Sequence, residues 1–413
     1  MKTRRELVAG TAGGMVLMGL GARVATALGF SRTPTNQHDV PSASDLTRVR
    51  IAGVDVFALS VPFKKPHAIA TGVIPSVRNV LVRLRTDAGV YGLGEGCPLP
   101  LISGESQDTC IAAAHEIASV LNGKAAIPIE ARMREVDAAL AANPTIKSAF
   151  DMALYDILGK LSRLPLYALL GGENRPVATH RTVSLDTPES MAATAAEYVG
   201  AGFEAIKLKV GTGIADDVAR VRAVRLAIGG SIPIRVDANQ GWDEPTAVAA
   251  LEALAPFGVQ FCEQPVAHWD LSAMARITSR SPIPVMADES LLDHHDAYRL
   301  ASLGACNYFN VKLTKCGGVH NALRVIAIAE GAGLKCQAGC MGETRLGLSA
   351  LAHLAAARDN IAFADIDSAF RHAIDPVEGG ITYKGGKVTV PETPGIGADI
   401  DPRFLATLTR VSF

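Results

Sequence analysis

The sequence predicts an α/β protein, a modified (β/α)8 barrel of the TIM type preceded by a smaller α+β domain. Its 413 residues, 48% of them hydrophobic, exceed what one small core needs and suit a barrel plus a second domain. From about residue 173 onward, apolar β-rich runs alternate with Ala- and Leu-rich amphipathic stretches. Eight such runs begin roughly 25 to 30 residues apart, the length of one strand and helix unit, and eight units close a barrel.

Residues 1–27 have the pattern of a twin-arginine export signal. Arg4 and Arg5 precede a Gly- and Ala-rich apolar stretch, and Ala25-Thr26-Ala27 is a small-residue cleavage site. The apolar stretch is too short and too rich in glycine for a stable membrane span. We therefore expect the folded protein to be exported to the periplasm, and residues 28–47, rich in Ser, Thr, Pro and Asn, to form a linker.

Residues 48–172 predict the α+β domain. β-branched runs at 54–59 and 77–86 indicate strands, and Asp87-Ala88-Gly89 indicates a tight turn, so an antiparallel sheet is expected. Helical spacing of apolar residues predicts helices over 108–122 and 145–163. The glycine-rich run 91–96 is not a nucleotide-binding loop, because its glycine spacing is wrong and no helix follows it.

Residues 173–374 predict the barrel. The eight expected strands are 179–185, 205–210, 232–237, 259–263, 284–288, 308–312, 335–338 and 361–365. Residues 375–413 are rich in turns, with a strand at 381–383, and we expect them to return to the first domain.

Charge and cysteine content narrow the function. Lys and Arg number 40 and Asp and Glu 41, for a net charge of -1, so no global field draws the protein to nucleic acid or to an acidic membrane. A small-molecule partner is expected instead. The 7 cysteines are scattered and lack a C-x-x-C pair, which argues against disulfides and zinc and predicts buried thiols.

Acidic residues end three consecutive predicted strands, the third, fourth and fifth: Asp237, Glu263 and Asp288. Reactive groups of such barrels gather at the carboxyl ends of the strands, which lie about 4.8 Å apart, so the three carboxylates should converge on one ion. Oxygen ligands without His or Cys select a hard cation, and three carboxylates that leave room for water and substrate suit Mg²⁺. Without a cation such a cluster would repel itself.

Lysines flank this predicted metal site. Lys207 and Lys209 lie two residues apart on the second strand and share a face, whereas Lys312 ends the sixth strand. Strands two and six are opposite in a ring of eight, which places Lys209 and Lys312 on opposite walls with the metal between them. A substrate carboxylate on the metal would present its α-carbon to a base on each side, as a racemase or epimerase requires, and the metal would stabilise the enediolate.

The ordered motifs resemble the muconate lactonizing enzyme subgroup of the enolase superfamily, in which a lysine base works with Mg²⁺. They are Lys207-Leu208-Lys209, Asp237-Ala238-Asn239, Glu263-Gln264-Pro265, Asp288-Glu289-Ser290 and the run from Asn310 to Gly318 that holds Lys312 and Lys315. The resemblance extends from residue 49 to the C-terminus and implies an enolase-like capping domain over the barrel. It further implies Mg²⁺ on the three acids, acid/base catalysis by the two facing lysines, and supporting positions for Asn239 and Lys315.

Asp365-Ile366-Asp367, at the end of the eighth strand, resembles dipeptide epimerases of the L-Ala-D/L-Glu epimerase type. The resemblance implies that Asp365 and Asp367 hold the α-ammonium group of a dipeptide, with Lys207 as a further substrate contact. The metal then takes the carboxylate, and the proton that moves belongs to the α-carbon of the C-terminal residue. An alternative is that the two acids cap the following turn.

Other functions stay open on the same scaffold: cycloisomerisation, dehydration, racemisation of an acylated amino acid, or an exported binding protein without catalysis.

The loop near residues 64–72 should close over the side chain of the C-terminal residue, and Ile69-Ala70-Thr71 offers no arginine for a glutamate. The remaining possible selectors are Lys64, Lys65, His67, Glu343 and Arg345. Because barrels with capping domains are often multimeric, we expect a homo-oligomer.

Overall fold

The computed structural model describes residues 46–413, so the predicted export signal and residues 28–45 of the predicted linker lie outside the described residues. The described chain folds as a parallel barrel with an α+β domain ahead of it, which confirms the predicted fold class. Two separate hydrophobic cores hold it together, one in the barrel and one between the first sheet and its helices. Within residues 46–413, none of the helices is long and apolar enough to span a bilayer.

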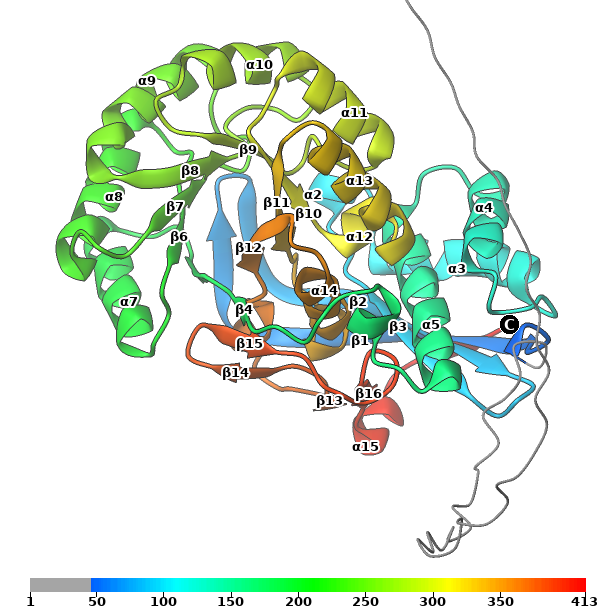
Figure 1. Cartoon of the computed structure of the whole chain (residues 1–413). Helices are drawn as coiled ribbons and strands as arrows, with labels where there is room; N and C mark the ends of the chain where they lie inside the picture. Colours follow the sequence, from blue (N-terminus) through cyan, green and yellow to red (C-terminus); the bar gives the residue numbers. More distant parts are fainter. Residues whose placement is uncertain (1–45) are drawn as a thin grey trace, which may run out of the picture. The chain divides into compact units, whose positions relative to one another are not determined.

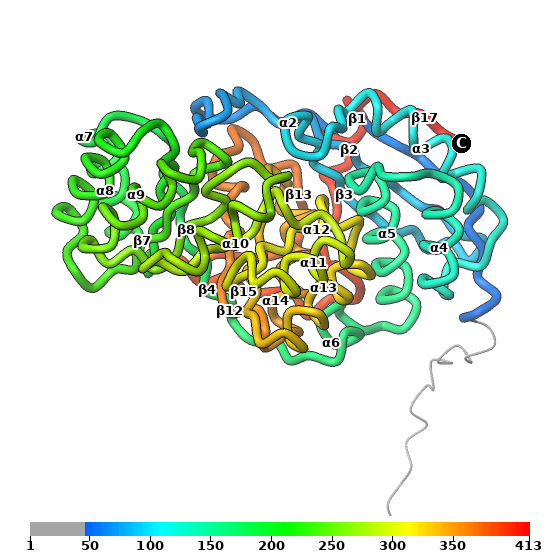
Figure 2. The backbone as a smooth tube through the Cα atoms, turned by 90° about the horizontal axis from the view of Figure 1, so that it is seen from above, coloured from blue at the N-terminus to red at the C-terminus, as the bar shows by residue number. Residues whose placement is uncertain are grey.

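The first domain is built on a long antiparallel hairpin. β1 (Ile51–Ile69) pairs with β2 (Gly72–Thr86), and β3 (Tyr91–Gly96) follows the turn at Asp87-Ala88-Gly89. Both predicted strands are confirmed, although β1 continues ten residues past residue 59. The far end of the hairpin reaches over the barrel, where the backbone N–H of Leu185 donates to the carbonyl of Ala68 at 3.0 Å (Figure 2).

Helices cover one face of this sheet. They are α3 (Gln107–Leu121), α4 (Ile129–Ala139) and α5 (Pro144–Ser162), with the short α2 (Pro100–Ser103) before them. They confirm the helices predicted over 108–122 and 145–163. A Cβ at Gly92 or Gly94 would collide with backbone carbonyls of α5, so these glycines of β3 allow the close approach of strand and helix.

All eight predicted barrel strands are present in one parallel sheet, in the order β12-β11-β10-β9-β8-β7-β6-β5. They are β5 (Arg181–Val183), β6 (Ile206–Lys209), β7 (Ile234–Asp237), β8 (Val259–Glu263), β9 (Val285–Ala287), β10 (Tyr308–Val311), β11 (Lys335–Gly339) and β12 (Ile361–Asp365). A parallel bridge between Thr179 and Ala364 closes the ring. The predicted bounds differ from these by at most two residues at either end.

The barrel helices lie outside the strands, as Figure 1 shows for α7 to α11. They are α7 (Pro188–Gly200), α8 (Ile214–Ile228), α9 (Glu244–Leu254), α10 (Leu271–Arg280), α11 (His294–Leu303), α13 (Val319–Gly331) and α14 (Arg345–Ala357). The short helix α12 (Leu313–Cys316) precedes α13. After β12 the described chain enters the 3-10 turn η2 (Ser368–Arg371) where a regular barrel would have its eighth helix.

The last residues form small sheets and then rejoin the first domain. β13 (Val377–Gly379) pairs with β16 (Ala398–Ile400), and β14 (Thr382–Lys384) with β15 (Lys387–Thr389), which also pairs with β4 (Val177–Ala178). β14 is the strand predicted at 381–383, shifted by one residue. After α15 (Pro402–Leu405), β17 (Arg410–Ser412) pairs with β1, with Ser412 opposite Asp55.

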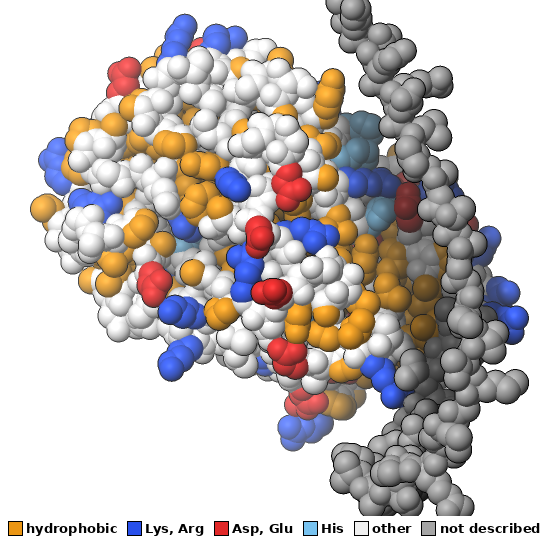
Figure 3. Space-filling model, viewed as in Figure 1, with side chains coloured by type: hydrophobic (Ala, Val, Ile, Leu, Met, Phe, Trp, Pro, Cys, Tyr) orange, Lys and Arg blue, Asp and Glu red, His pale blue; other side chains and the backbone are white. Residues whose placement is uncertain are grey.

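The seven cysteines are all free and buried, as predicted. Basic and acidic side chains are interspersed over the face drawn in Figure 3, in keeping with the net charge of -1.

Candidate active site

The three predicted metal ligands form a row at the carboxyl end of the barrel. Asp237 ends β7 and is the register partner of Glu263, which ends β8, while Asp288 follows β9 directly. Their exposures are 1%, 0% and 0%. Three buried carboxylates on consecutive strands, offering only oxygen donors, fit a hard cation such as Mg²⁺.

Lys209 and Lys312 approach this row from its two ends. Nζ of Lys209, the last residue of β6, lies 2.7 Å from Oδ2 of Asp237. Nζ of Lys312, which follows β10, lies 2.7 Å from Oδ2 of Asp288. Because β6 and β10 flank β7, β8 and β9 in the strand order, the two amines stand on opposite sides of the carboxylates and line the same cavity. This is the placement predicted from the sequence.

Lys207 lies on the same face as Lys209, as predicted, but deeper. Its Nζ lies 2.9 Å from Oδ2 of Asp237, 2.9 Å from Oε2 of Glu263 and 3.0 Å from Oδ2 of Asp365. Burial lowers the pKa of Lys207, but these carboxylates outweigh it and hold the pKa well above its usual range. Lys207 is therefore a fixed cation that links the row of acids to Asp365. Burial also lowers the pKa of Lys312, but Asp288 and Glu263 outweigh it and raise the pKa, so the two amines differ in position rather than in pKa.

The lysines also set the charge of the row. Burial raises the pKa of Asp237, yet Lys207 and Lys209 outweigh it and bring the pKa to about 2. Burial also opposes ionisation of Asp288, whose pKa is nevertheless lowered, chiefly by Lys312. Glu263, between the two, has its pKa raised to about 8 by burial and by Asp237. A divalent cation in the row would favour the ionised form of all three.

Asn239 and Lys315 contact the row as the resemblance implies. Oδ1 of Asn239 accepts a hydrogen bond from Lys209 Nζ at 2.8 Å, and its amide donates to Oε1 of Glu289 at 3.2 Å. Nζ of Lys315 lies 2.6 Å from Oδ1 of Asp288. These contacts hold Lys209 and Asp288 in position.

Two amides to which the sequence motifs assigned no role complete the surroundings of Glu263. Nδ2 of Asn310 donates to its Oε1 at 2.8 Å, and Nε2 of Gln337 donates to its Oε2 at 3.2 Å. Asn310 lies on β10 two residues before Lys312, so the period of two along a strand places both on one face. That signal could have identified Asn310 in advance.

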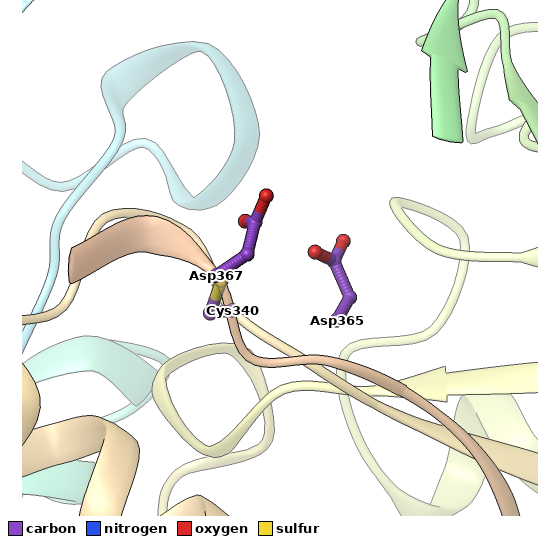
Figure 4. A group of neighbouring side chains, drawn as sticks. All are labelled: Cys340, Asp365 and Asp367. Atoms are coloured by element: carbon purple, nitrogen blue, oxygen red, sulfur yellow. The ribbon is translucent and has the colours of Figure 1, made fainter. Parts of the chain in front are cut away.

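Asp365 and Asp367 lie side by side, but in different surroundings (Figure 4). Asp365 lines the cavity, and His180 Nε2 lies 3.0 Å from its Oδ1. Asp367 is fully buried. Its Oδ2 accepts a hydrogen bond from Arg181 Nη1 at 2.8 Å, and Arg371 Nη2 lies 3.5 Å from its Oδ1. The structure thus brings Asp365 into the site and pairs Asp367 with two arginines that the sequence did not reveal.

Cys340 joins these two acids in a compact group (Figure 4). One potential ligand atom of each residue lies within 4.8 Å of the others. Burial raises the pKa of Cys340 to about 12, so its thiol is neutral. Because a neutral thiol is a poor ligand for a hard cation, this group does not suit Mg²⁺.

A second cavity adjoins the first. It has a volume of about 450 Å³ and shares Thr182 and Arg371 with the cavity that holds the lysines. Lys64, Lys65 and Arg181 also line it. A ligand bound at the acids can therefore extend past Asp365 into a larger space.

Fold and site together define a protein of the enolase type, a barrel that carries three acids between facing lysines under a capping domain. The model described as "Mandelate racemase / muconate lactonizing enzyme, N-terminal domain" matches residues 51–171, and "Enolase C-terminal domain-like" matches residues 190–404. The chain belongs to the mandelate racemase/muconate lactonizing enzyme family.

The names or ligands of three similar proteins contain different dipeptides. The D-Ala-D/L-Ala epimerase of Cytophaga hutchinsonii is 41% identical over 87% of this chain and 99% of its own length. The L-Ala-D/L-Glu epimerase of Bacillus subtilis is 37% identical over 84% of this chain and 96% of its own. The structure of a dipeptide epimerase from Enterococcus faecalis with Mg and L-Leu-L-Tyr superposes with a TM-score of 0.83, at 40% identity, and covers 85% of this chain and 99% of that one.

Proposed function

We propose that this protein is a Mg²⁺-dependent dipeptide epimerase that inverts the α-carbon of the C-terminal residue by proton transfer between two lysines. The observation that carries the proposal is the placement of Lys209 and Lys312 at opposite ends of one row of buried carboxylates. The similarity of this chain to several dipeptide epimerases, over most of its length, supports the substrate class.

Asp237, Glu263 and Asp288 would hold the metal, because they supply a buried set of oxygen donors. Bound there, Mg²⁺ would polarise the substrate carboxylate and supply positive charge beside it. Lys207 lies against the same row and supplies a fixed positive charge beside that carboxylate.

The two lysines exchange roles with the direction of the reaction. With the substrate carboxylate at the acids, the α-carbon lies between the amines. One neutral amine removes the α-proton from its face, and the other, as an ammonium, returns a proton to the opposite face. Asn239 orients Lys209 through its hydrogen bond, while Asp288 orients Lys312. Inversion therefore needs both lysines, whereas removal of the proton needs only one.

The other end of the dipeptide points along β12. Asp365 lines the cavity, and its carboxylate is the group that we assign to the substrate's α-ammonium. The adjoining cavity of about 450 Å³ gives room to the side chain of the N-terminal residue. This space favours a dipeptide over a free amino acid.

Racemisation of an acylated amino acid is the second candidate. The observation that favours it is the pairing of Asp367 with Arg181 and Arg371, which weakens the attraction of that carboxylate for an ammonium group. An acylated substrate has no ammonium group to anchor. Comparison of dipeptides with their N-acetyl derivatives separates the two candidates, because only the epimerase should prefer the free amino terminus.

The direct test is incubation of Mg²⁺-loaded protein with a panel of L,L-dipeptides in deuterated water. We expect deuterium to enter at the α-carbon of the C-terminal residue and the L,D-epimer to accumulate, both followed by NMR. Removal of the metal by EDTA should stop both, and added Mg²⁺ should restore them. Absence of exchange with every dipeptide would refute the proposed function.

Localisation and assembly are separate proposals. The twin-arginine pair Arg4-Arg5 and the cleavage pattern at Ala25-Thr26-Ala27 support export to the periplasm. We also propose that the protein forms a homo-oligomer, because barrels with capping domains are often multimeric.

A further inference from the structure

Apart from His67, the residues that the capping domain contributes to the lining of the catalytic cavity are apolar. These are Ile69 of β1, Ile74 of β2, Leu99 just before α2, and Ile102 of α2, and Met341, which follows β11, adds a fifth apolar side chain. These five residues are called the apolar roof below.

The geometry of proton transfer determines which part of the substrate contacts the apolar roof. When the α-proton leaves, the α-carbon becomes planar, with its carboxylate, its nitrogen and its side chain in one plane. The carboxylate points to the row of acids. The amide nitrogen leads through the N-terminal residue toward Asp365, while Lys209 and Lys312 lie on the two faces of the plane. The side chain takes the third direction in the plane, away from the acids and the two lysines, and the apolar roof supplies five residues of the cavity lining available there.

Charged groups around this cavity are tied to other partners. Lys207, Lys209 and Lys312 contact the acids of the barrel, and Arg371 pairs with Asp367 at the end assigned to the N-terminal residue. His67 lies beside the roof, with Nδ1 2.6 Å from Ser184 Oγ. Burial and then Arg371 lower its pKa, so its ring is neutral at pH 7. Among the described residues, the apolar roof therefore offers no cation for an acidic side chain.

The other possible selectors from the sequence supply no cation to the apolar roof. Lys64 donates to the carbonyl of Phe370 at 3.2 Å and lines the adjoining cavity, as Lys65 does. Glu343 accepts a hydrogen bond from the backbone N–H of Met341 at 2.7 Å. Nε of Arg345 lies 2.5 Å from Oδ2 of Asp375, and Arg345 lines neither cavity.

We propose that the residue whose α-carbon is inverted carries an apolar side chain, and that the apolar roof determines this specificity. The inference rests on the proposed function. A glutamate side chain would lose its hydration against the roof without gaining a charged partner, whereas an apolar side chain of similar length gains contact area. The similar proteins do not decide this point, because their names and ligands include Ala, Glu and Tyr.

The test compares L-Ala-L-Met with L-Ala-L-Glu, whose C-terminal side chains have similar lengths and differ in charge. We expect kcat/KM for α-proton exchange in deuterated water to be at least roughly 100-fold higher for the methionine dipeptide. An equal or higher value for the glutamate dipeptide would overturn the inference and leave the proposed function standing. Exchange with no dipeptide at all would overturn both.

Two pairs of variants locate the specificity. Ile74→Arg and Ile102→Arg place a cation in the roof, and we expect each to shift the Met/Glu ratio at least roughly tenfold toward glutamate. Val73→Arg and Leu101→Arg are the matched controls, because these neighbours are 66% and 61% exposed, and their ratios should stay unchanged. Thermal melts establish that each variant is folded. Folded roof variants with an unchanged ratio would contradict the role of the roof.

Discussion

Single residues at the barrel mouth divide into fixed cations and amines that stand beside one carboxylate. Lys207 contacts three carboxylates, whereas Lys209 contacts Asp237 and Lys312 contacts Asp288. The second arrangement leaves each amine at the edge of the cavity, where a substrate α-carbon can reach it. Lys207 also lines this cavity but is held between three carboxylates, so the position of Lys209 and Lys312 at the two ends of the row distinguishes the amines that transfer protons.

Removal of one lysine should uncouple proton exchange from inversion. We expect Lys209→Met and Lys312→Met each to lower the rate of inversion at least roughly 1000-fold, because both amines take part in it. Each variant should still exchange the α-proton of one epimer, and the two variants should retain opposite epimers. NMR in deuterated water follows both signals. Lys335→Met, at the exposed start of β11, is the control and should behave as the parent protein. Full inversion by either single variant would contradict the two-lysine mechanism.

Asp365 and Asp367 should respond differently to substitution. Asp365→Asn should raise KM about tenfold for a dipeptide with a free amino terminus and leave its N-acetyl derivative unchanged, because only the former has an ammonium group. Asp367→Asn should instead lower the free energy of unfolding by about 3 kcal/mol, since it leaves Arg181 and Arg371 without their carboxylate in a buried setting. Urea denaturation and steady-state kinetics measure the two effects. Equal effects of both substitutions on KM and stability would contradict this division.

Among the elements, α14 is fixed to its neighbours by a neutral histidine. Nδ1 of His353 accepts a hydrogen bond from the backbone N–H of Tyr167 in α6 (Leu166–Leu169) at 3.3 Å, and Nε2 donates to the carbonyl of Ile396 at 3.1 Å. A second proton on the ring would break the first of these bonds. Burial accordingly lowers the pKa of His353 to about 4.

This histidine predicts a loss of stability in acid. Because the folded-state pKa lies below the unfolded value of about 6.5, the unfolded state binds more protons between these two values. The contribution of His353 is therefore complete above pH 6.5 and is lost as the pH falls toward 4, by about 2 kcal/mol at pH 5. Urea denaturation from pH 7.5 to 5 should show the decline, and His353→Gln, which does not titrate, should show less of it. An equal decline in both proteins would contradict this assignment.

At the scale of the whole chain, export should depend on the arginine pair. Arg4→Lys together with Arg5→Lys should prevent export, because the twin-arginine pair is the feature that the export machinery reads. Cell fractionation should find the parent protein in the periplasm, shortened after Ala27, and the double variant at full length in the cytoplasm. Arg23→Lys lies in the same segment outside the pair and is the matched control. Periplasmic accumulation of the double variant would contradict the proposed localisation.

The local pattern of the sequence determined the barrel strands and the chemistry at their ends. Strand period, strand spacing and the residue that ends each strand are all properties of short segments, so Asp237, Glu263 and Asp288 could be placed in a row before the structure was known. Lys209 and Lys312 followed from the same ring of eight strands, because closure alone puts the second strand opposite the sixth.

The sequence predicted that the last residues return to the first domain, but only the tertiary structure decided which residues of distant segments meet. β17 pairs with β1 more than 340 residues away, Arg181 and Arg371 pair with Asp367, and Ile69, Ile74 and Ile102 of the capping domain form a wall of the barrel's cavity. No local period encodes these contacts, because each depends on how two separately folded segments pack. The reaction can therefore be inferred from strand ends, but the choice of substrate side chain depends on that packing.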